Sequence, residues 1–213
     1  MRTSTRWTVA VVVVVVALVA ALWTQLGPEN SQTGSTGTGA PRERRDTDTA
    51  EALAGPRARA ELAPCPGAGE GDGPEALRGI VLECVGDGSS VDVAKAVAGR
   101  TVVLNLWAYW CAPCARELPA MAEYQRRAGS EVTVLTVHQD ENETAALLRL
   151  AELGVHLPTV QDGRRRIAAA LKVPNVMPAT VLLRPNGSVA AILPEAFTDA
   201  DQIASAVVQH IGP

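Results

Sequence analysis

Two cysteines separated by two residues, Cys111 and Cys114, have the spacing of a redox-active pair. They follow a continuous apolar run, Thr101 to Trp107, that predicts a strand buried on both faces, and they begin a stretch of helical composition that reaches Ala128. Unpaired backbone N–H groups and the helix dipole stabilise a thiolate at the start of a helix. We therefore predict that Cys111 attacks a substrate disulfide and that Cys114, one turn further on, resolves the mixed disulfide.

A zinc site and a purely structural disulfide are the alternatives for this pair. Tetrahedral zinc sites commonly use two close pairs of ligands, whereas the other two cysteines, Cys65 and Cys84, are near neither each other nor a histidine in the sequence. A disulfide inside a Cys-x-x-Cys ring is strained and easily reduced, which is a property that a redox catalyst needs. We expect no metal and no cofactor at the site.

The first 26 residues predict export. Arg2 and Arg6 precede an apolar stretch from Trp7 to Leu26, which is near the roughly 20 residues that cross a bilayer. We interpret residues 1–26 as a transmembrane anchor, with a cleaved signal sequence as the alternative. The protein is then expected in the cell membrane as a single-pass protein whose catalytic domain is extracytoplasmic.

Residues 27–62 are rich in Gly, Ser, Thr, Pro and charges, and they predict a disordered linker because they offer few side chains for a core. A helix from Thr49 to Ala63 is the alternative. Residues 63–213 are expected to form the folded domain. From Glu61 onward the sequence has twelve Lys and Arg but eighteen Asp and Glu, so its net charge is negative. Nucleic acid is therefore not an expected partner.

Cys65 and Cys84 are predicted to form a structural disulfide, because an exported domain folds in an oxidising compartment. A second redox pair that relays electrons is the alternative. Neither cysteine lies at an evident helix N-terminus, which favours the structural role.

The remaining sequence alternates strand and helix patterns. Succession of strand, helix and strand implies a parallel pair with a crossover, and the Asn186-Gly187 turn predicts a closing hairpin. We therefore expect an α/β fold with a mixed central sheet flanked by helices. Strand patterns lie at Ile80 to Val85, Val132 to Val137, Ala179 to Arg184 and Val189 to Leu193, and helical patterns at Asn142 to Leu153, Arg164 to Leu171 and Thr198 to His210.

Several blocks together resemble the TlpA/ResA-like branch of the thioredoxin superfamily: TVVLNLWAYWCAPCARELPAM, VTVLTVHQDE, LPTVQD and VMPATVLLRPNGSV. The resemblance extends from about Val81 to the C-terminus. It implies a thioredoxin fold with an N-terminal β extension and an inserted helix between Asp140 and Leu153.

The same resemblance implies a substrate-binding surface around the cysteines. Pro178 matches a cis-proline that packs against the disulfide, and Met177 matches a residue that offers backbone groups to an extended substrate; an ordinary proline at a strand start is the alternative. We assign Trp110, Ala112 and Pro113 to this surface as well.

Other side chains near the pair are open to two interpretations. Trp107 is expected to shield the disulfide together with Trp110, and core packing is its stronger alternative. His138 ends the strand pattern after the redox helix, and we interpret it as a surface polar residue rather than a part of the site, because the sequence offers it no partner.

Proton handling is expected to differ from that of thioredoxins. Asn105 stands where thioredoxins keep a buried Asp, and it cannot accept a proton. Glu117 matches a family glutamate near the redox pair and lies one helical turn beyond Cys114. Our hypothesis is that Glu117 tunes or deprotonates the Cys114 thiol; the alternative is a solvated glutamate that only favours the helix dipole.

The Ala112-Pro113 dipeptide bears on the direction of electron flow. Oxidants of the DsbA type stabilise the thiolate with a histidine between the cysteines, and Ala112 and Pro113 offer neither charge nor side-chain donor. The expected function is reduction of disulfides in exported proteins. The resemblance adds apocytochrome c as a substrate and a CcdA/DsbD-like membrane thiol donor as a partner. A dithiol oxidase and a non-catalytic binding or chaperone module are the alternatives.

Overall fold

The computed structural model describes residues 42–212. The predicted anchor, residues 1–26, and the first part of the predicted linker, residues 27–41, lie outside the described residues. Among residues 42–212, none of the helices has both the length and the hydrophobicity that crossing a bilayer requires.

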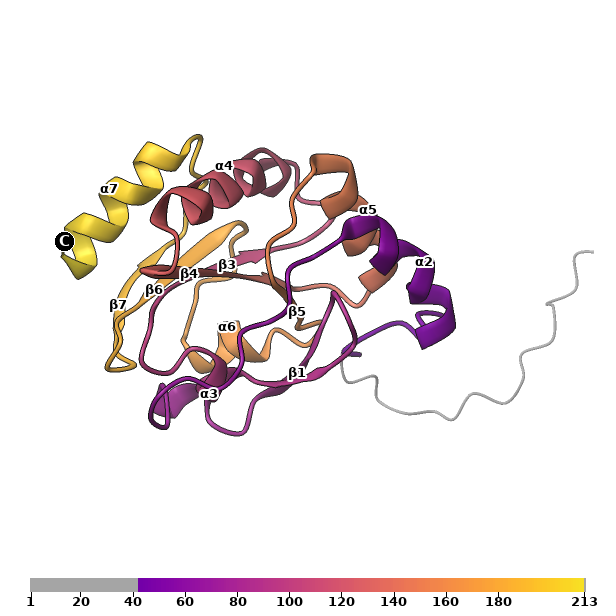
Figure 1. Ribbon diagram of the computed structural model, residues 1–213, viewed down its shortest axis with the longest axis horizontal. Coiled ribbons are helices and arrows are strands. Elements are labelled where there is room, and N and C mark those ends of the chain that lie inside the picture. The colour runs from indigo at the N-terminus through magenta and orange to yellow at the C-terminus, as the bar shows by residue number, and fades with distance from the viewer. Residues whose placement is uncertain (1–41, 213) are drawn as a thin grey trace, which may run out of the picture. The chain divides into compact units, whose positions relative to one another are not determined.

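The described chain alternates strands and helices as expected for an α/β fold (Figure 1). The helices are α2 (Ala50–Ala60), a short 3-10 helix η1 (Glu75–Leu77), α3 (Val93–Ala96), α4 (Ala112–Ala128), α5 (Glu143–Leu153), α6 (Arg166–Ala170) and α7 (Ala200–Ile211). The strands are β1 (Val81–Cys84), β2 (Ser90–Asp92), β3 (Thr101–Trp107), β4 (Val132–His138), β5 (Thr159–Gln161), β6 (Ala179–Leu183) and β7 (Val189–Leu193).

Within residues 42–212, seven strands form one sheet in the order β2-β1-β5-β4-β3-β6-β7. The sheet has a parallel centre, in which β4 pairs with β3 on one side and with β5 on the other. The outer pairs are antiparallel: β6 with β3, β7 with β6, β1 with β5 and β2 with β1. The predicted mixed sheet and the N-terminal β extension are therefore confirmed. β5 has no counterpart among the predicted strand patterns, because three residues are too few to show a periodicity.

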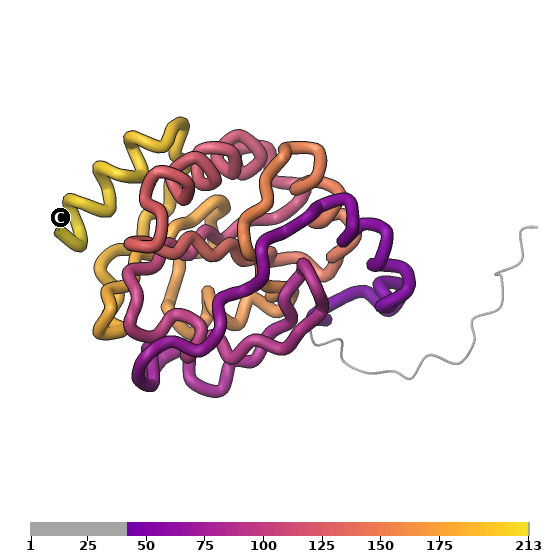
Figure 2. The backbone as a smooth tube through the Cα atoms, in the orientation of Figure 1, coloured from indigo at the N-terminus to yellow at the C-terminus, as the bar shows by residue number. Residues whose placement is uncertain are grey.

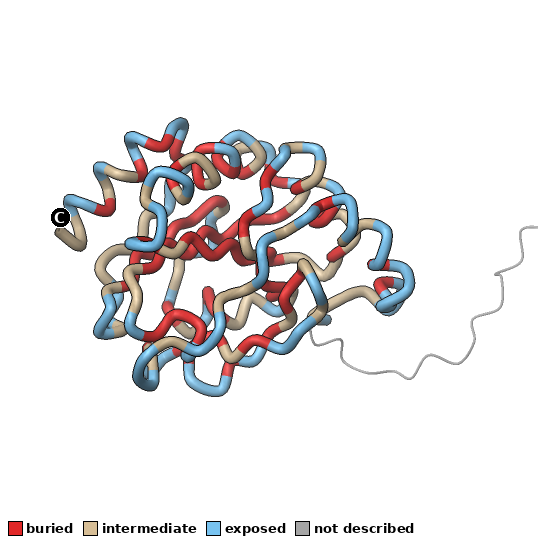
Figure 3. Tube along the Cα trace, viewed as in Figure 1, coloured by how far each residue is buried: buried red, intermediate tan, exposed pale blue. Residues whose placement is uncertain are grey.

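β3 is the centre of the core, and both of its faces are covered (Figures 1 and 3). Val103 and Trp107 pack in the cluster under α4 and α7, while Leu104 and Leu106 pack in the cluster with α3 and α6. The continuous apolar run therefore forms the doubly buried strand that it predicts.

The last helix, α7, is capped by Asp199, whose side chain accepts from the Gln202 N–H at 2.9 Å. The prediction that Thr198 begins this helix is therefore wrong by one residue.

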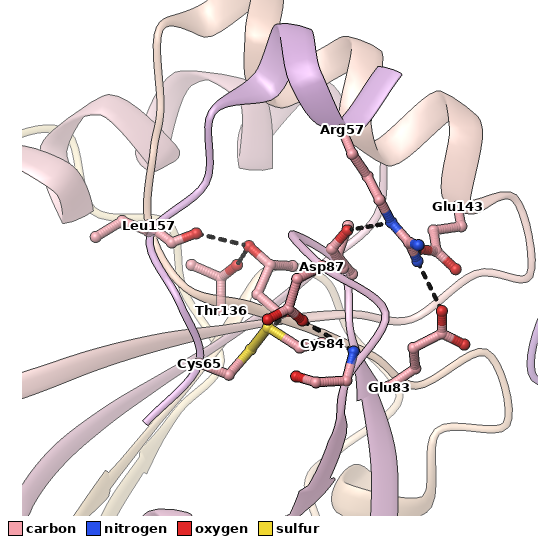
Figure 4. Close-up of a disulfide and its surroundings, with 11 residues drawn as sticks. Arg57, Cys65, Glu83, Cys84, Asp87, Thr136, Glu143 and Leu157 are labelled. Carbon is pink, nitrogen blue, oxygen red and sulfur yellow. Dashed lines mark hydrogen bonds and ion pairs between the residues drawn. A yellow bond between two sulfur atoms is a disulfide. The ribbon is translucent and has the colours of Figure 1, made fainter. Parts of the chain in front are cut away.

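The prediction of a disordered linker is wrong for residues 42–62, which form an ordered arm. Its helix α2 lies beside α5 (Figures 1 and 2). Leu53 and Ala60 pack in one apolar cluster with Leu147. Arg57 donates to Glu83 at 2.7 Å and to Glu143 at 2.9 Å (Figure 4). Besides this apolar packing, the arm is thus joined to both β1 and α5 by one guanidinium.

The arm also contacts the N-terminus of α5, next to its N-cap residue Asn142. Asp48 accepts from the backbone N–H of Glu143 at 3.0 Å and from the Thr144 hydroxyl at 2.6 Å. Arg45 donates to the same carboxylate at 2.9 Å. A carboxylate at a helix N-terminus is favourable because it accepts unpaired N–H groups. The inserted helix predicted between Asp140 and Leu153 is thus present as α5 and is held by the arm.

Cys65 and Cys84 are joined by a disulfide, as predicted (Figure 4). Cys84 is fully buried on β1, and Cys65 lies in the segment that follows α2. The bond links the segment just after the arm to the β extension across 19 residues of sequence.

Replacing both residues, Cys65→Ser with Cys84→Ser, is expected to lower the free energy of unfolding by about 3 kcal/mol, because the unfolded chain is no longer constrained by the loop. Urea unfolding without reductant measures the loss. The folded variant should turn over disulfide substrates at the wild-type rate. Unchanged stability with abolished turnover would instead identify a second redox pair.

Candidate active site

The redox pair lies at the start of α4, directly after β3. Cys111 is the N-cap residue, and its Sγ accepts from the Cys114 N–H at 3.2 Å. The two sulfurs form a disulfide, with Cα atoms 5.3 Å apart. Cys111 is 5% exposed and Cys114 is fully buried, so Cys111 is the outer sulfur, as expected. The N-terminus of a 17-residue helix thus points at the sulfur that the sequence assigns as the nucleophile.

The two residues between the cysteines offer no polar side chain to the disulfide. Ala112 is exposed and Pro113 is half-buried in the first turn, where a missing N–H is tolerated. Beneath the pair lies an apolar cluster that includes Leu118. The thiolate at this position therefore depends on backbone N–H groups of the helix for its stabilisation.

The Met177-Pro178 peptide bond is cis, as the resemblance implies. Pro178 is buried, and Met177 is half-buried and packs against the cluster that contains both cysteines. The segment before β6 and the redox pair therefore border the same part of the surface, which is where an extended substrate is expected to bind.

The two tryptophans next to the pair occupy different environments. Trp110 is 58% exposed, and its Nε1 donates to Asp140 Oδ2 at 3.0 Å. Trp107 is fully buried and donates from Nε1 to the Thr136 hydroxyl at 3.2 Å. Core packing is thus the correct interpretation of Trp107, and of the two tryptophans only Trp110 is exposed beside the pair. Asp140 was not predicted, because its contact with Trp110 joins loops that are separated in sequence.

His138 is fully buried, so the interpretation of a surface residue is wrong. Its Nδ1 lies 2.9 Å from Gln161 Oε1, and its ring packs beside Trp107 and Tyr109 with centroid separations of 5.0 and 6.1 Å. Burial lowers the pKa of His138 to about 4, so the ring is neutral at physiological pH. A neutral ring does not stabilise a thiolate by charge.

Glu117 is fully buried between α4 and the sheet, so the interpretation of a solvated glutamate is wrong. Asn105 Nδ2 donates to Oε2 at 2.7 Å, and the Phe197 N–H donates to Oε1 at 3.0 Å. Burial raises the pKa of Glu117 to about 7, against the lowering effect of these two hydrogen bonds. Near neutral pH the carboxyl can therefore both accept and release a proton. Phe197, 80 residues away in sequence, was not predicted to take part.

The Redoxin family profile matches residues 71–207, which is more than half of the chain. The chain belongs to the Redoxin family. It is 32% identical over 115 residues to the thiol-disulfide oxidoreductase ResA of Bacillus subtilis, a match that covers 54% of this chain and 63% of that protein. It is also 31% identical over 116 residues to the ResA of Oceanobacillus iheyensis, a match that covers 53% of this chain and 58% of that protein. These relatives confirm the resemblance to the TlpA/ResA-like branch, and this Redoxin chain spans less than two thirds of their length.

Solved structures confirm the thioredoxin fold of this Redoxin family member. A secreted Mycobacterium tuberculosis disulfide oxidoreductase homologous to E. coli DsbE superposes with a TM-score of 0.55 at 20% identity, covering 63% of this chain and 98% of that one. A DsbF homologue from Corynebacterium diphtheriae gives a TM-score of 0.56 at 24% identity, covering 84% and 98%.

In the oxidised protein, Glu117→Gln is expected to become more stable relative to wild type as the pH rises from about 4.5 to 7. The folded-state pKa of about 7 lies above the ordinary 4.5, so the wild type loses stability as the unfolded chain releases this proton first. A difference of about 2.5 pH units corresponds to roughly 3 kcal/mol across this window.

Urea unfolding at pH 5 and pH 8, with exposed Glu195→Gln as the control, measures this difference. If the difference in the free energy of unfolding between Glu117→Gln and wild type is the same at both pH values, Glu117 does not have the raised pKa expected of a buried carboxyl.

Proposed function

We propose that this protein is a thiol–disulfide oxidoreductase that reduces disulfides of exported proteins. The observation that carries the proposal is the Cys111–Cys114 disulfide at the N-terminus of α4, with Cys111 as the outer sulfur. The curated relatives of this Redoxin family member bear the name thiol-disulfide oxidoreductase, which supports the same activity.

The reaction begins with the reduced pair. The Cys111 thiolate attacks one sulfur of a substrate disulfide, the substrate S–S bond breaks, and the leaving thiolate takes a proton from solvent. Cys114 gives its proton to the Glu117 carboxylate and attacks Cys111 Sγ, which releases the second substrate sulfur. The substrate gains two electrons and the pair becomes a disulfide. An external thiol donor must then reduce the pair again.

Substrate contact is assigned to the surface beside Cys111. Trp110 is exposed there, and Met177 and cis-Pro178 border the same cluster. An extended segment of the substrate places its disulfide against Cys111 while its backbone pairs with Met177. The small exposed Ala112 leaves this approach open.

The direction of electron flow is supported by what surrounds the disulfide. Ala112 and Pro113 bring no charge, and His138 is held neutral by burial. The Cys111 thiolate is therefore stabilised less than in a strong oxidant, and a less stable thiolate form favours electron donation.

The compartment and partners are part of the proposal. The Arg2 and Arg6 flank of the apolar run supports a membrane anchor with an extracytoplasmic domain, and the Cys65–Cys84 disulfide supports an oxidising compartment. Apocytochrome c is a proposed substrate and a CcdA/DsbD-like membrane thiol protein is the proposed electron donor.

Substrate trapping tests the assignment of the two sulfurs. Cys114→Ser is expected to accumulate mixed disulfides through Cys111, because the resolving thiol is gone, while the matched Cys111→Ser variant accumulates none. Non-reducing gels after incubation with disulfide-bonded insulin show the adducts. Wild-type protein should also accelerate insulin reduction by dithiothreitol, and a rate equal to dithiothreitol alone would identify a binding module instead.

The reduction potential of the pair tests the direction. We expect a value closer to that of thioredoxin, about −270 mV, than to that of DsbA, about −120 mV. Equilibration in dithiol buffers followed by thiol alkylation measures it, with the Cys65→Ser/Cys84→Ser variant as the control that isolates the active pair. A value near that of DsbA would make the protein a dithiol oxidase.

A further inference from the structure

Three fully buried polar side chains lie on the side of the sheet that α4 covers: Glu117 on α4, Asn105 on β3 and Thr180 on β6. Asn105 on β3 and Thr180 on β6 are directly opposite each other in the antiparallel register. Directly opposed residues project from the same face of a sheet. Asn105 reaches Glu117 beneath α4, so Thr180 projects toward the same space. Leu182, two residues beyond Thr180, packs in the cluster of the redox cysteines, which agrees with this placement.

Asn105 uses only half of its amide. Its Nδ2 donates to Glu117 Oε2, so Oδ1 needs a different partner that donates. Asn105 Oδ1 and Thr180 Oγ1 are both buried without a hydrogen-bond partner among residues 42–212. Buried polar atoms without partners are rare and costly, and here two of them belong to opposed residues beside a carboxyl.

We propose that Asn105 Oδ1 and Thr180 Oγ1 bind one buried water molecule that hydrogen-bonds to Glu117 and holds its carboxylate ready to take the proton of Cys114. The water donates to Asn105 Oδ1 and to a free lone pair of Glu117, and it accepts from the Thr180 hydroxyl. Three such partners are what a buried water typically has. The inference rests on the proposed function for its consequence in catalysis.

In the assisted step, the S–H bond of Cys114 breaks and an O–H bond forms on Glu117, with no transfer of electrons to the carboxyl. Thr180 is then a positioning residue, because it acts on Cys114 only through the water and Glu117. A water that donates to the carboxylate stabilises the ionised form. Its loss makes Glu117 bind its proton more tightly, so the base form exists only at higher pH.

Few other titratable groups face Glu117. β3 and β6 carry no titratable side chain, and the pKa of Glu117 is shifted by burial and by its hydrogen bonds from Phe197 and Asn105. Glu195 and Asp199, which flank Phe197, are exposed. A change in the proton affinity of Glu117 is therefore expected to follow from its hydrogen bonds rather than from a neighbouring charge.

Thr180→Val keeps the shape of the side chain and removes the hydroxyl. The pH dependence of the resolving step, measured by stopped flow on a preformed mixed disulfide, is expected to shift its acidic midpoint upward by about half to one pH unit. Thr180→Ser retains the hydroxyl and should keep the wild-type midpoint. High-resolution crystal structures are expected to show the water in wild type and not in Thr180→Val.

Thr136→Val is the matched control. Thr136 flanks Asn105 on the other side, in register on β4, but its hydroxyl already accepts from Trp107 and lies 2.7 Å from the Thr159 hydroxyl. This variant should leave the midpoint unchanged. Equal midpoints for wild type, Thr136→Val and folded Thr180→Val would overturn the inference, as would a wild-type crystal structure without this water.

Glu117→Gln separates this inference from the proposed function. If Glu117→Gln removes the acidic limb of the profile while Thr180→Val leaves it in place, the water role fails and the proton-acceptor role of Glu117 stands. If Glu117→Gln has the wild-type profile, the proton-acceptor role and the catalytic role of the water both fail. A wild-type protein that does not reduce insulin overturns the proposed function, and the crystal structures still decide whether the water is bound.

Discussion

The hydrogen bond from the Cys114 N–H to Cys111 Sγ is the interaction on which the site depends. It exists because α4 begins where β3 ends, and β3 is held in place by β4 on one side and β6 on the other. Seven residues of β3 pair with β4 in continuous parallel register, which positions the end of the strand and thus the first turn of the helix. Stabilising a sulfur anion by backbone N–H groups requires this rigidity, because the donors must already point at the sulfur.

The apolar surroundings of the disulfide set its proton chemistry. Burial opposes charge on every group, so it raises the pKa of Glu117 and lowers that of His138. The outcomes differ because the shift moves the pKa of the carboxyl up toward neutral pH and moves the pKa of the imidazole down, away from it. His138 has Gln161 as its partner and remains neutral. One physical cause therefore leaves Glu117 able to ionise near neutral pH and leaves His138 uncharged.

The N-terminal arm connects the β extension to the inserted helix. Arg57 joins Glu83 on β1 to Glu143 on α5 (Figure 4). Asp48 accepts from the first turn of α5. The segment just before α5 contains Asp140, which holds the exposed Trp110 beside the redox pair. The arm therefore stabilises, through α5, the loop that orients the surface where substrate is expected to bind.

The local features of this protein are determined by the sequence itself. The redox pair, the doubly buried strand before it and the helix after it are neighbours in the chain, so periodicity and spacing reveal them. The Cys65–Cys84 pairing follows because only two further cysteines exist. The burial of Glu117 and His138, and the packing of residues 42–62 against the domain, are decided only by the tertiary structure. These outcomes depend on partners such as Phe197, which is 80 residues from Glu117, and no local pattern records a contact over that separation.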